Sequence, residues 1–286
     1  MSSVAGMLRA AREKLDPAEA RLLLGHVLGQ SAAWLVAHDD EPLSEPQLAL
    51  FASLCARRRG GEPIAYLTGY REFYGRDFAV APGVLIPRPE TELLVDIAKT
   101  EIQTRVDAGR NAASGQATVR TLDLGTGSGC IAISIALECQ AMQPDVLALD
   151  ASACALDIAR ANAERLEASV RFIESHWFAE LANERFDLIV SNPPYIAAQD
   201  PHLRQGDLVH EPASALASGA DGLDAISTIT DLAPRFLQPG GSLWLEHGYD
   251  QAEAVLNLLQ QRGYTAIEQH LDIAGIVRVT GGIWAG

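Results

Sequence analysis

The chain has 286 residues, of which 48% are hydrophobic, and its formal net charge is −15. This length and hydrophobic content suit one large domain or two ordinary ones and exclude a disordered chain. Residues 121–286 hold 22 Asp and Glu against 8 Lys and Arg, an excess that disfavours phosphate backbones and anionic membranes as partners, although acidity also serves solubility.

Residues 1–60 carry the signals of helices. Asp16-Pro17 combines a capping residue with a proline at the first helical position, and Ser44-Glu45-Pro46 repeats that signal. A bundle of this size buries too little surface to be very stable alone. We therefore expect a small N-terminal helical domain over residues 1–60, joined to a larger domain.

Residues 61–90 mix aromatic and β-branched residues with glycines, a pattern that favours a β-hairpin or an extended linker. A helix is then expected to open near Pro87 and to continue past Ile97. Residues 106–118 are polar and rich in glycine, alanine and serine, and they predict a surface loop.

From residue 119 onward, short apolar runs alternate with helical patterns. This rhythm is typical of a parallel sheet covered by helices on both faces, and it predicts an α/β domain over residues 91–286. Two final runs joined by a short turn predict a closing pair of strands. The expected strands are 119–124, 146–149, 170–173, 186–190, 242–245, 264–270 and 275–280.

A glycine-rich loop follows the first of these strands and precedes a helix expected at 130–137. Glycine lets the backbone approach a ligand and turn sharply into a helix, whose first N–H groups can bind that ligand. The loop also fits a permissive G-x-G-x-x-A dinucleotide pattern, and a tight strand-to-helix turn would need glycine as well. The loop residues expected at a cofactor are Gly125, Thr126, Gly127, Ser128 and Gly129.

Asp150 ends the next expected strand. A carboxylate at this position can accept hydrogen bonds from both ribose hydroxyls of a nucleoside-type cofactor. Without a ligand it would be an ordinary capping aspartate. The loop and Asp150 together support a nucleoside cofactor, but they do not choose between NAD and S-adenosylmethionine.

The sequence Asn192-Pro193-Pro194-Tyr195 follows the strand expected at 186–190. Proline has a fixed φ and no N–H, so this stretch is stiff and offers carbonyl oxygens with few donors. The Asn192 side-chain oxygen and the Pro193 carbonyl could hold both N–H bonds of a planar NH₂ group, with Tyr195 on its flat face. Methyl transfer to such a nitrogen needs this arrangement and hydride transfer does not, which favours S-adenosylmethionine. An Asn-Pro turn at a strand end is the alternative.

With these motifs, the chain resembles the protein-(glutamine-N5) methyltransferases that modify peptide chain release factors. The resemblance covers nearly the whole length. Asn-Pro-Pro-Tyr alone also occurs in adenine-N6 and guanine-N2 methyltransferases. Two other matching segments, 61–69 and 71–73, are far more specific because they are attached to a helical domain. The matching segments are 61–69, 71–73, 86–92, 123–129, 191–196, 211–212, 215–216 and 245–248.

The resemblance implies a Rossmann-like seven-stranded class I methyltransferase sheet and S-adenosylmethionine as cofactor. It implies as substrate the glutamine of a Gly-Gly-Gln motif on a release factor. By motif position, the glycine loop would contact the methionine part of the cofactor, Asp150 its ribose and Trp177 its adenine. Residues 192–195 would hold the glutamine, with Asn192 and Pro193 as the catalytic residues and Asn192 also beside the cofactor.

This chain departs from the family at one position of the expected site. The family often has aspartate where this chain has His176, which could supply an acceptor through a neutral ring nitrogen. Trp177, the next residue, could also be a plain core aromatic.

Three other functions stay open. A methyltransferase of DNA or RNA amines would share residues 192–195 but would need a basic channel, which the acidic half of the chain opposes. A nicotinamide-dependent reductase would use the glycine loop and leave the proline motif idle. A non-catalytic cofactor-binding module is the third.

The helical domain would grip the protein substrate, or it would simply cap the sheet domain.

Four cysteines, none of them in a CxxC pair, favour buried thiols in a reducing compartment over disulfides or a metal site. Neither a signal-peptide pattern nor an apolar run of membrane-spanning length is visible. We therefore expect a cytoplasmic monomer without a metal, which binds release factors and contacts neither nucleic acid directly nor a membrane.

Overall fold

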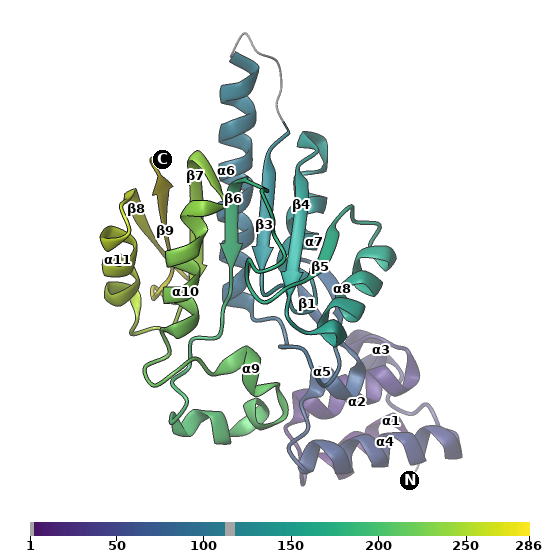
Figure 1. Cartoon of the computed structure of the whole chain (residues 1–286). Coiled ribbons are helices and arrows are strands. Elements are labelled where there is room, and N and C mark those ends of the chain that lie inside the picture. The colour runs from purple at the N-terminus through teal and green to yellow at the C-terminus, as the bar shows by residue number, and fades with distance from the viewer. Residues whose placement is uncertain (1–2, 112–117) are drawn as a thin grey trace. The chain divides into compact units, whose positions relative to one another are not determined.

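A seven-stranded sheet and a separate group of helices make up the chain, described over residues 3–111 and 118–286 in this computed structural model (Figure 1). The helical unit comprises the residues up to Tyr70 together with Arg204–His210, and the sheet unit comprises Arg71–Leu203 and Glu211–Gly286. The predicted α/β fold with an N-terminal helical region is thus confirmed. Within the described ranges, no helix is both long enough and apolar enough to cross a bilayer.

Side-chain caps start the helices of the helical unit. Ser3, Asp16 and Ser31 each accept a hydrogen bond from a backbone N–H of the first turn. The apolar faces of these helices meet in one core around Leu24 and Phe51. The helices are α1 (Val4–Ala11), α2 (Pro17–Leu28), α3 (Ala32–Ala37), α4 (Glu45–Arg59) and α5 (Ile64–Thr68).

The helical unit extends to Tyr70, beyond the boundary that the sequence predicted at residue 60. Helix α5 lies in the segment that was expected to be extended, because its Leu67 packs into the core of the helical unit. The hairpin itself is short and forms a two-stranded sheet of β1 (Tyr70–Phe73) and β2 (Arg76–Ala79).

The large sheet has the strand order β5-β4-β3-β6-β7-β9-β8. Neighbours from β5 to β7 pair in parallel, and β9 is antiparallel to both β7 and β8. The chain winds outward from β3 to β5 and returns to β6 beside β3, which makes a topological switch point where ligands usually bind. The strands are β3 (Arg120–Leu124), β4 (Asp145–Asp150), β5 (Arg171–Glu174), β6 (Phe186–Ser191), β7 (Leu237–Glu246), β8 (Tyr264–Leu271) and β9 (Val277–Trp284).

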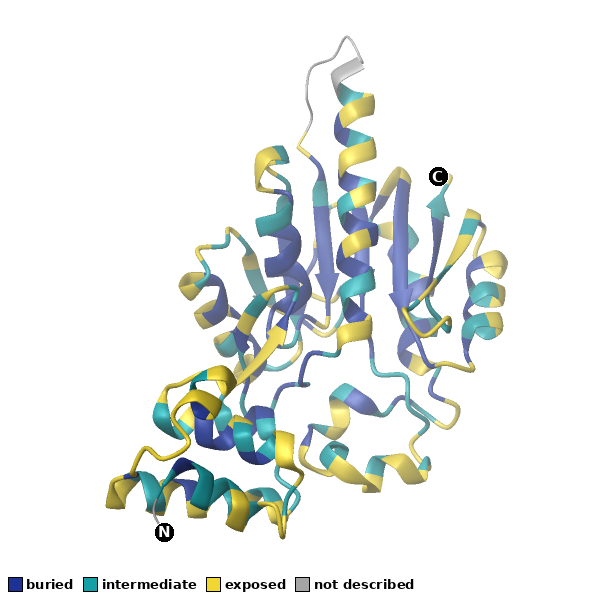
Figure 2. Ribbon diagram, turned by 180° about the vertical axis from the view of Figure 1, so that it is seen from behind, coloured by how far each residue is buried: buried dark blue, intermediate teal, exposed yellow. Residues whose placement is uncertain are grey.

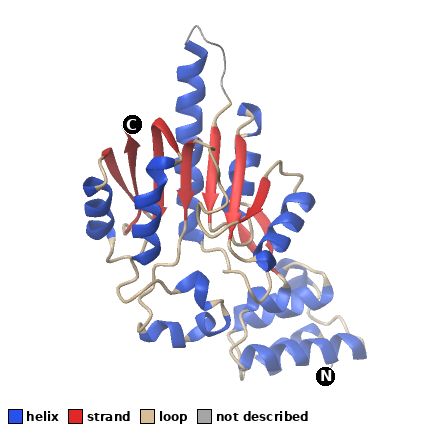
Figure 3. Ribbon diagram, viewed as in Figure 1, coloured by secondary structure: helices blue, strands red, loops and turns tan. Residues whose placement is uncertain are grey.

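Helices cover both faces of the sheet, as Figures 2 and 3 show, and alternate residues of a strand pack towards one or the other layer. Leu147 lies in one core with residues of α10 and α11, whereas Val146 and Ala148 lie in the other core with residues of α6, α7 and α8. The helices are α6 (Glu92–Asn111), α7 (Cys130–Glu138), α8 (Ala153–Arg165), α9 (Ala213–Leu216), α10 (Asp224–Leu232) and α11 (Ala252–Gln261).

Helix α6 continues to Asn111, although the sequence predicted a loop from residue 106. Ile102 and Val106 are buried in the core between this helix and the sheet. Their packing stabilises the helix although the segment is polar in composition. The predicted loop also included residues 112–117, which lie outside the described residues.

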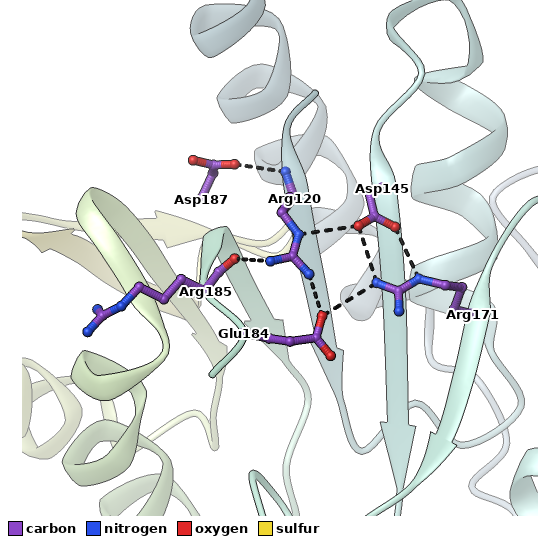
Figure 4. Close-up of polar contacts among 6 residues, drawn as sticks. All are labelled: Arg120, Asp145, Arg171, Glu184, Arg185 and Asp187. Atoms are coloured by element: carbon purple, nitrogen blue, oxygen red, sulfur yellow. Dashed lines mark hydrogen bonds and ion pairs between the residues drawn. The ribbon is translucent and has the colours of Figure 1, made fainter. Parts of the chain in front are cut away.

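Paired charges tie the amino-terminal edge of the sheet together (Figure 4). Arg120, the first residue of β3, forms ion pairs with Asp145 and Glu184. Arg171, the first residue of β5, pairs with the same two carboxylates. The Arg120 main-chain N–H donates to Asp187 of β6 at 2.8 Å. The beginnings of four adjacent strands are thereby connected through charged side chains.

Candidate active site at the carboxyl edge of the sheet

The carboxyl ends of four neighbouring strands lie level with one another. Leu124 of β3 pairs with Leu149 of β4 and with Ser191 of β6, and Ser191 pairs with Leu245 of β7. This register brings together the last residues of these strands and the segments that follow them. They contain the glycine loop 125–129, Asp150, Asn192 and Glu246.

Three glycines of the loop adopt φ angles that other residues rarely reach: 73° at Gly125, 56° at Gly127 and 82° at Gly129. A Cβ atom at Gly129 would lie 2.8 Å from Ile133 Cδ1, so packing of helix α7 also requires glycine there. At Gly127, apart from its two chain neighbours, no heavy atom of the described residues lies within 4 Å of a would-be Cβ. The loop is therefore a tight turn and also a stretch of backbone that borders open space.

The buried carboxylate of Asp123 holds this loop. Its Oδ2 accepts hydrogen bonds from the Thr126 hydroxyl at 2.7 Å and from the Ala132 N–H at 3.2 Å. Burial raises the pKa of Asp123 to about 7, and its Oδ1 has no hydrogen-bond partner in the described part of the chain. The side chains of Thr126 and Ser128 are both buried, so these two residues would contact a cofactor through their backbone.

Asn162 of helix α8 fixes the loop from another direction. Its Nδ2 donates to the Ser128 carbonyl at 2.9 Å, and its amide exchanges two hydrogen bonds with the main chain of Ala79. Sequence reasoning missed this residue, since its partners lie 34 and 83 positions away and no local pattern marks it.

Asp150, the last residue of β4, connects its strand to the glycine loop. Its carboxylate accepts hydrogen bonds from the Gly127 N–H at 2.8 Å and from the Ser152 N–H at 2.9 Å. Burial raises the pKa of Asp150 against the effect of these bonds. The Ala151 N–H also stabilises this carboxylate, whose two oxygens offer about four acceptor positions, more than these N–H groups use. Asp150 can therefore cap the loop and still accept hydroxyl groups of a ligand.

Trp177 follows β5 and lies beside the glycine loop, where a Cβ at Gly125 would come within 3.7 Å of its ring. Its backbone is left-handed, with φ 52°, and Ser175 stabilises this turn by donating to the Trp177 carbonyl at 2.8 Å. The ring packs partly against the core and is partly exposed. Both expected roles, a core aromatic and a contact for a flat ligand, fit this position. His176 is exposed, and its ring centroid lies 5.9 Å from that of Trp177.

Asn192 follows β6 directly, and the neighbouring Pro193 is buried. The Asn192 Nδ2 donates to the Thr91 hydroxyl at 3.0 Å. Thr91 is buried at the end of the 3₁₀ turn Pro89–Thr91. No hydrogen bond within residues 3–111 and 118–286 occupies the Asn192 Oδ1, so this oxygen is available as an acceptor.

Tyr195 is held by Glu246, the last residue of β7. The Tyr195 hydroxyl donates to Glu246 Oε1 at 3.3 Å, and burial raises the pKa of Tyr195, which therefore stays neutral. Burial also raises the pKa of Glu246 to about 7, against the effect of hydrogen bonds from Thr91 and Tyr195. The Tyr195 carbonyl accepts a bond from Gln251 Nε2 at 3.0 Å. Both ends of Tyr195 are thus fixed, and Pro193 and Pro194 lie between the two held residues, Asn192 and Tyr195.

Glu211 anchors the segment that carries Thr91. Its buried carboxylate accepts a hydrogen bond from the Ile86 N–H at 2.9 Å and pairs with Arg88. These residues come from two of the segments on which the family resemblance rests. Their contact ties those two segments to each other.

Thr91 and Glu246 contact the predicted site residues but were not among them. The Asn192–Thr91 bond spans 101 positions and the Tyr195–Glu246 bond spans 51, so only the matching segments 86–92 and 245–248 could have pointed to them. In the part of the chain that the structure describes, no group of three or more His, Cys, Asp or Glu side chains is arranged to hold a metal ion.

Two family models match the chain. The PrmC N-terminal domain matches residues 2–69, and the methyltransferase small domain matches residues 104–251. The release factor glutamine methyltransferase of Bordetella pertussis is 52% identical, over 92% of this chain and 93% of the relative. That of Burkholderia pseudomallei is 50% identical, over 98% of this chain and 96% of the relative.

A solved structure of the 16S rRNA methyltransferase RsmC of T. thermophilus, in complex with AdoMet and guanosine, is similar with a TM-score of 0.51. It is 20% identical and covers 75% of this chain and 49% of its own. At this identity the similarity concerns the fold, a sheet of the methyltransferase type.

Proposed function

The chain belongs to the family of release factor glutamine methyltransferases, and we propose that its reaction takes place at the carboxyl edge of the sheet. The reaction transfers a methyl group from S-adenosylmethionine to the side-chain amide nitrogen of a release factor glutamine. We assign that glutamine to a Gly-Gly-Gln motif and its binding to residues 192–195.

One observation carries this assignment: the Asn192 amide is held by its nitrogen. Because Nδ2 donates to Thr91, the oxygen is the atom that stays available. The Pro193 carbonyl follows on the same stiff stretch, which has no N–H at residues 193 and 194. Two acceptors and no competing donor suit a group that has only N–H bonds to offer, such as the NH₂ of a carboxamide.

The neighbouring residues suit S-adenosylmethionine. Gly127 borders open space, and Asp150 keeps acceptors that would hold the two ribose hydroxyls. Trp177 would contact the adenine, and the loop backbone would contact the methionine part. When bound, the cofactor supplies a methyl group on a positively charged sulfonium, a charge that the acidic surroundings favour.

Positioning is the main contribution of the chain to the rate. A carboxamide nitrogen is a weak nucleophile, because its lone pair is delocalised into the carbonyl. Asn192 Oδ1 and the Pro193 carbonyl accept its two N–H bonds, fix the nitrogen and stabilise the positive charge that grows on it. The methylated nitrogen becomes acidic and then loses one proton to solvent, so no strong base is needed beforehand.

We assign recognition of the protein substrate to the helical unit, which has a core of its own and matches the PrmC N-terminal domain. The substrate is a protein rather than a nucleic acid, because residues 121–286 hold 22 acidic against 8 basic residues and lack the excess of cations that phosphates require. We further propose that the chain acts as a monomer in the cytoplasm.

The test is a labelling experiment with methyl-labelled S-adenosylmethionine and four acceptors: a release factor, the same factor with its Gly-Gly-Gln glutamine replaced by alanine, tRNA and DNA. Label on the intact factor alone supports the proposal. Label on tRNA or DNA supports an exocyclic-amine methyltransferase instead. Equal label on both release factors places the reaction on another residue.

A further inference from the structure

We propose that Thr91 is a positioning residue of the reaction, whose buried hydroxyl, beside the Glu246 carboxylate, holds the Asn192 amide by its nitrogen and so decides which atom of that amide faces the substrate. This inference rests on the proposed role of Asn192. It concerns two residues that touch neither the glutamine nor the cofactor in that role, and that act only through the side chain they hold.

The direction of the hydrogen bonds follows from what each group can donate. Glu246 lies beside both hydroxyls: Tyr195 donates to its Oε1 at 3.3 Å, and burial raises the pKa of this carboxyl while the Thr91 hydroxyl lowers it. A carboxylate oxygen can only accept, so its charge favours the orientation in which the single hydrogen of the Thr91 hydroxyl points towards Glu246. The lone pairs of Thr91 Oγ1 are then left for Asn192, whose Nδ2 lies 3.0 Å away.

This arrangement leaves the Asn192 amide one favourable orientation. If the amide were turned over, its oxygen would face Thr91 Oγ1, whose hydrogen the Glu246 carboxylate attracts, and two acceptors would oppose each other. The NH₂ group would then point to the substrate, where it would meet N–H bonds instead of accepting them. The Thr91 hydroxyl therefore selects the orientation in which Oδ1 is presented.

Burial makes this selection strict. Thr91 is 2% exposed and Glu246 is 1% exposed, so water cannot replace a missing partner for either group. Tyr195 donates to the same Oε1 of Glu246 at 3.3 Å, which fixes the carboxylate from the substrate-binding segment as well. If Glu246 takes up a proton, Oε2, which has no partner among the described residues, can carry it while Oε1 continues to accept.

The position of Thr91 is fixed independently of Asn192. Its 3₁₀ turn, Pro89–Thr91, follows Arg88, and Arg88 and Ile86 are both bound by the buried Glu211. The segment that carries Thr91 is therefore held by contacts that do not involve Asn192. A residue that orients another side chain needs such independent support.

The experiment compares Thr91→Val, which has the shape of threonine without the hydroxyl, with Thr91→Ser, which keeps the hydroxyl. We expect Thr91→Val to lower kcat on the order of 10- to 100-fold through misorientation of the acceptor, while the KM for release factor and the Kd for S-adenosylhomocysteine change by less than about threefold. Thr91→Ser should recover most of the activity. Thermal unfolding checks each variant, and Thr91→Ala repeats the measurement if valine does not fold.

A double-mutant cycle with Asn192→Ala separates an action through Asn192 from a general structural role. Once Asn192 is gone, Thr91→Val should lower kcat by no more than about twofold further. An unaffected kcat in Thr91→Val, or a full additional loss in the double variant, would overturn the inference. If Asn192→Ala itself keeps wild-type turnover, the proposed function of the site fails, and this outcome is distinct from the other two.

Discussion

The two edges of the sheet use charged side chains in opposite ways. At the amino-terminal edge, Arg120 and Arg171 face Asp145 and Glu184, and each of these side chains is between 31% and 49% exposed (Figure 4). Ion pairs of this kind are hydrated, contribute little individually and require no ligand. They connect strands that already pair through their backbones.

At the carboxyl edge two carboxylates, Asp123 and Glu246, are buried. Asp123 and Glu246 have pKa values raised by burial to about 7, and each leaves one oxygen without a partner in the described part of the chain. Such groups cost folding free energy, because burial removes water that no protein group fully replaces. Buried carboxylates with this cost in folding free energy are retained where they position other groups. Here Asp123 holds the glycine loop, and Glu246 supports the side chains of Tyr195 and, beside Thr91, of Asn192.

Replacement of Asn192 by alanine should have the largest effect. Loss of one aimed acceptor is expected to lower kcat about 10²- to 10³-fold, by analogy with the loss of a single aimed donor in other enzymes. Cofactor affinity should change little, because the glycine loop and Asp150 remain. Single-turnover methylation of a release factor, with calorimetry for the cofactor, makes this measurement. Near wild-type turnover would exclude Asn192 from the chemistry.

The two aspartates that begin and end β4 offer a matched comparison of the edges. Asp150→Ala should weaken binding of S-adenosylmethionine by about 1–3 kcal/mol, since hydroxyl groups of the ligand lose their acceptors. Asp145→Ala, five positions earlier on the same strand at the other edge, should leave the Kd unchanged. Calorimetry on both variants decides the point: equal Kd values for Asp150→Ala and wild type would remove Asp150 from the site.

Buried Asp123 should also make stability depend on pH. Its folded pKa of about 7 lies above its usual value near 4, so the folded protein holds the proton more tightly. Its contribution to stability is complete below about pH 4 and is lost as the pH rises towards 7, by at most about 1.4 kcal/mol per pH unit.

The variant Asp123→Asn removes this titration while keeping an oxygen for Thr126 and Ala132. Urea unfolding at several pH values between about 4 and 7 should therefore show a smaller fall in the free energy of unfolding than in the wild type. Identical slopes for the two proteins would show that Asp123 is already ionised in the folded state at low pH.

Arg120→Ala should have the smallest effect and should act on stability alone. The guanidinium pairs with Asp145 and Glu184 and lies 5.0 Å from the centre of the Phe186 ring. Its loss should lower the free energy of unfolding by about 1 kcal/mol, and by less at high salt. The kcat and the cofactor Kd should match the wild type. A large loss of activity would break the division between a structural edge and a functional edge.

Local patterns were sufficient to place the candidate site residues that depend on strand ends at one edge of the sheet. The glycine loop, Asp150 and Asn192 each follow a strand that apolar runs reveal, and parallel strands bring their carboxyl ends to one edge. Helix α5 was missed because its apolar residues serve the core of the helical unit, which no short window reveals. Thr91 was missed for a similar reason, since its role depends on a contact across 101 positions.

The segments that match the family pointed to residues near the site but did not explain what those residues do. Glu211 and Glu246 lie in such segments, but only the folded chain shows that one anchors residues 86–88 and the other holds Tyr195. Their burial and their partners, rather than their residue types, distinguish support from chemistry.

A crystal structure with S-adenosylhomocysteine and a Gly-Gly-Gln peptide would examine the central claim most directly. We expect the glutamine nitrogen within about 3.2 Å of both Asn192 Oδ1 and the Pro193 carbonyl, with Asn192 Nδ2 still on Thr91. A glutamine bound elsewhere, or an Asn192 side chain that faces away from the sulfur, would contradict the account.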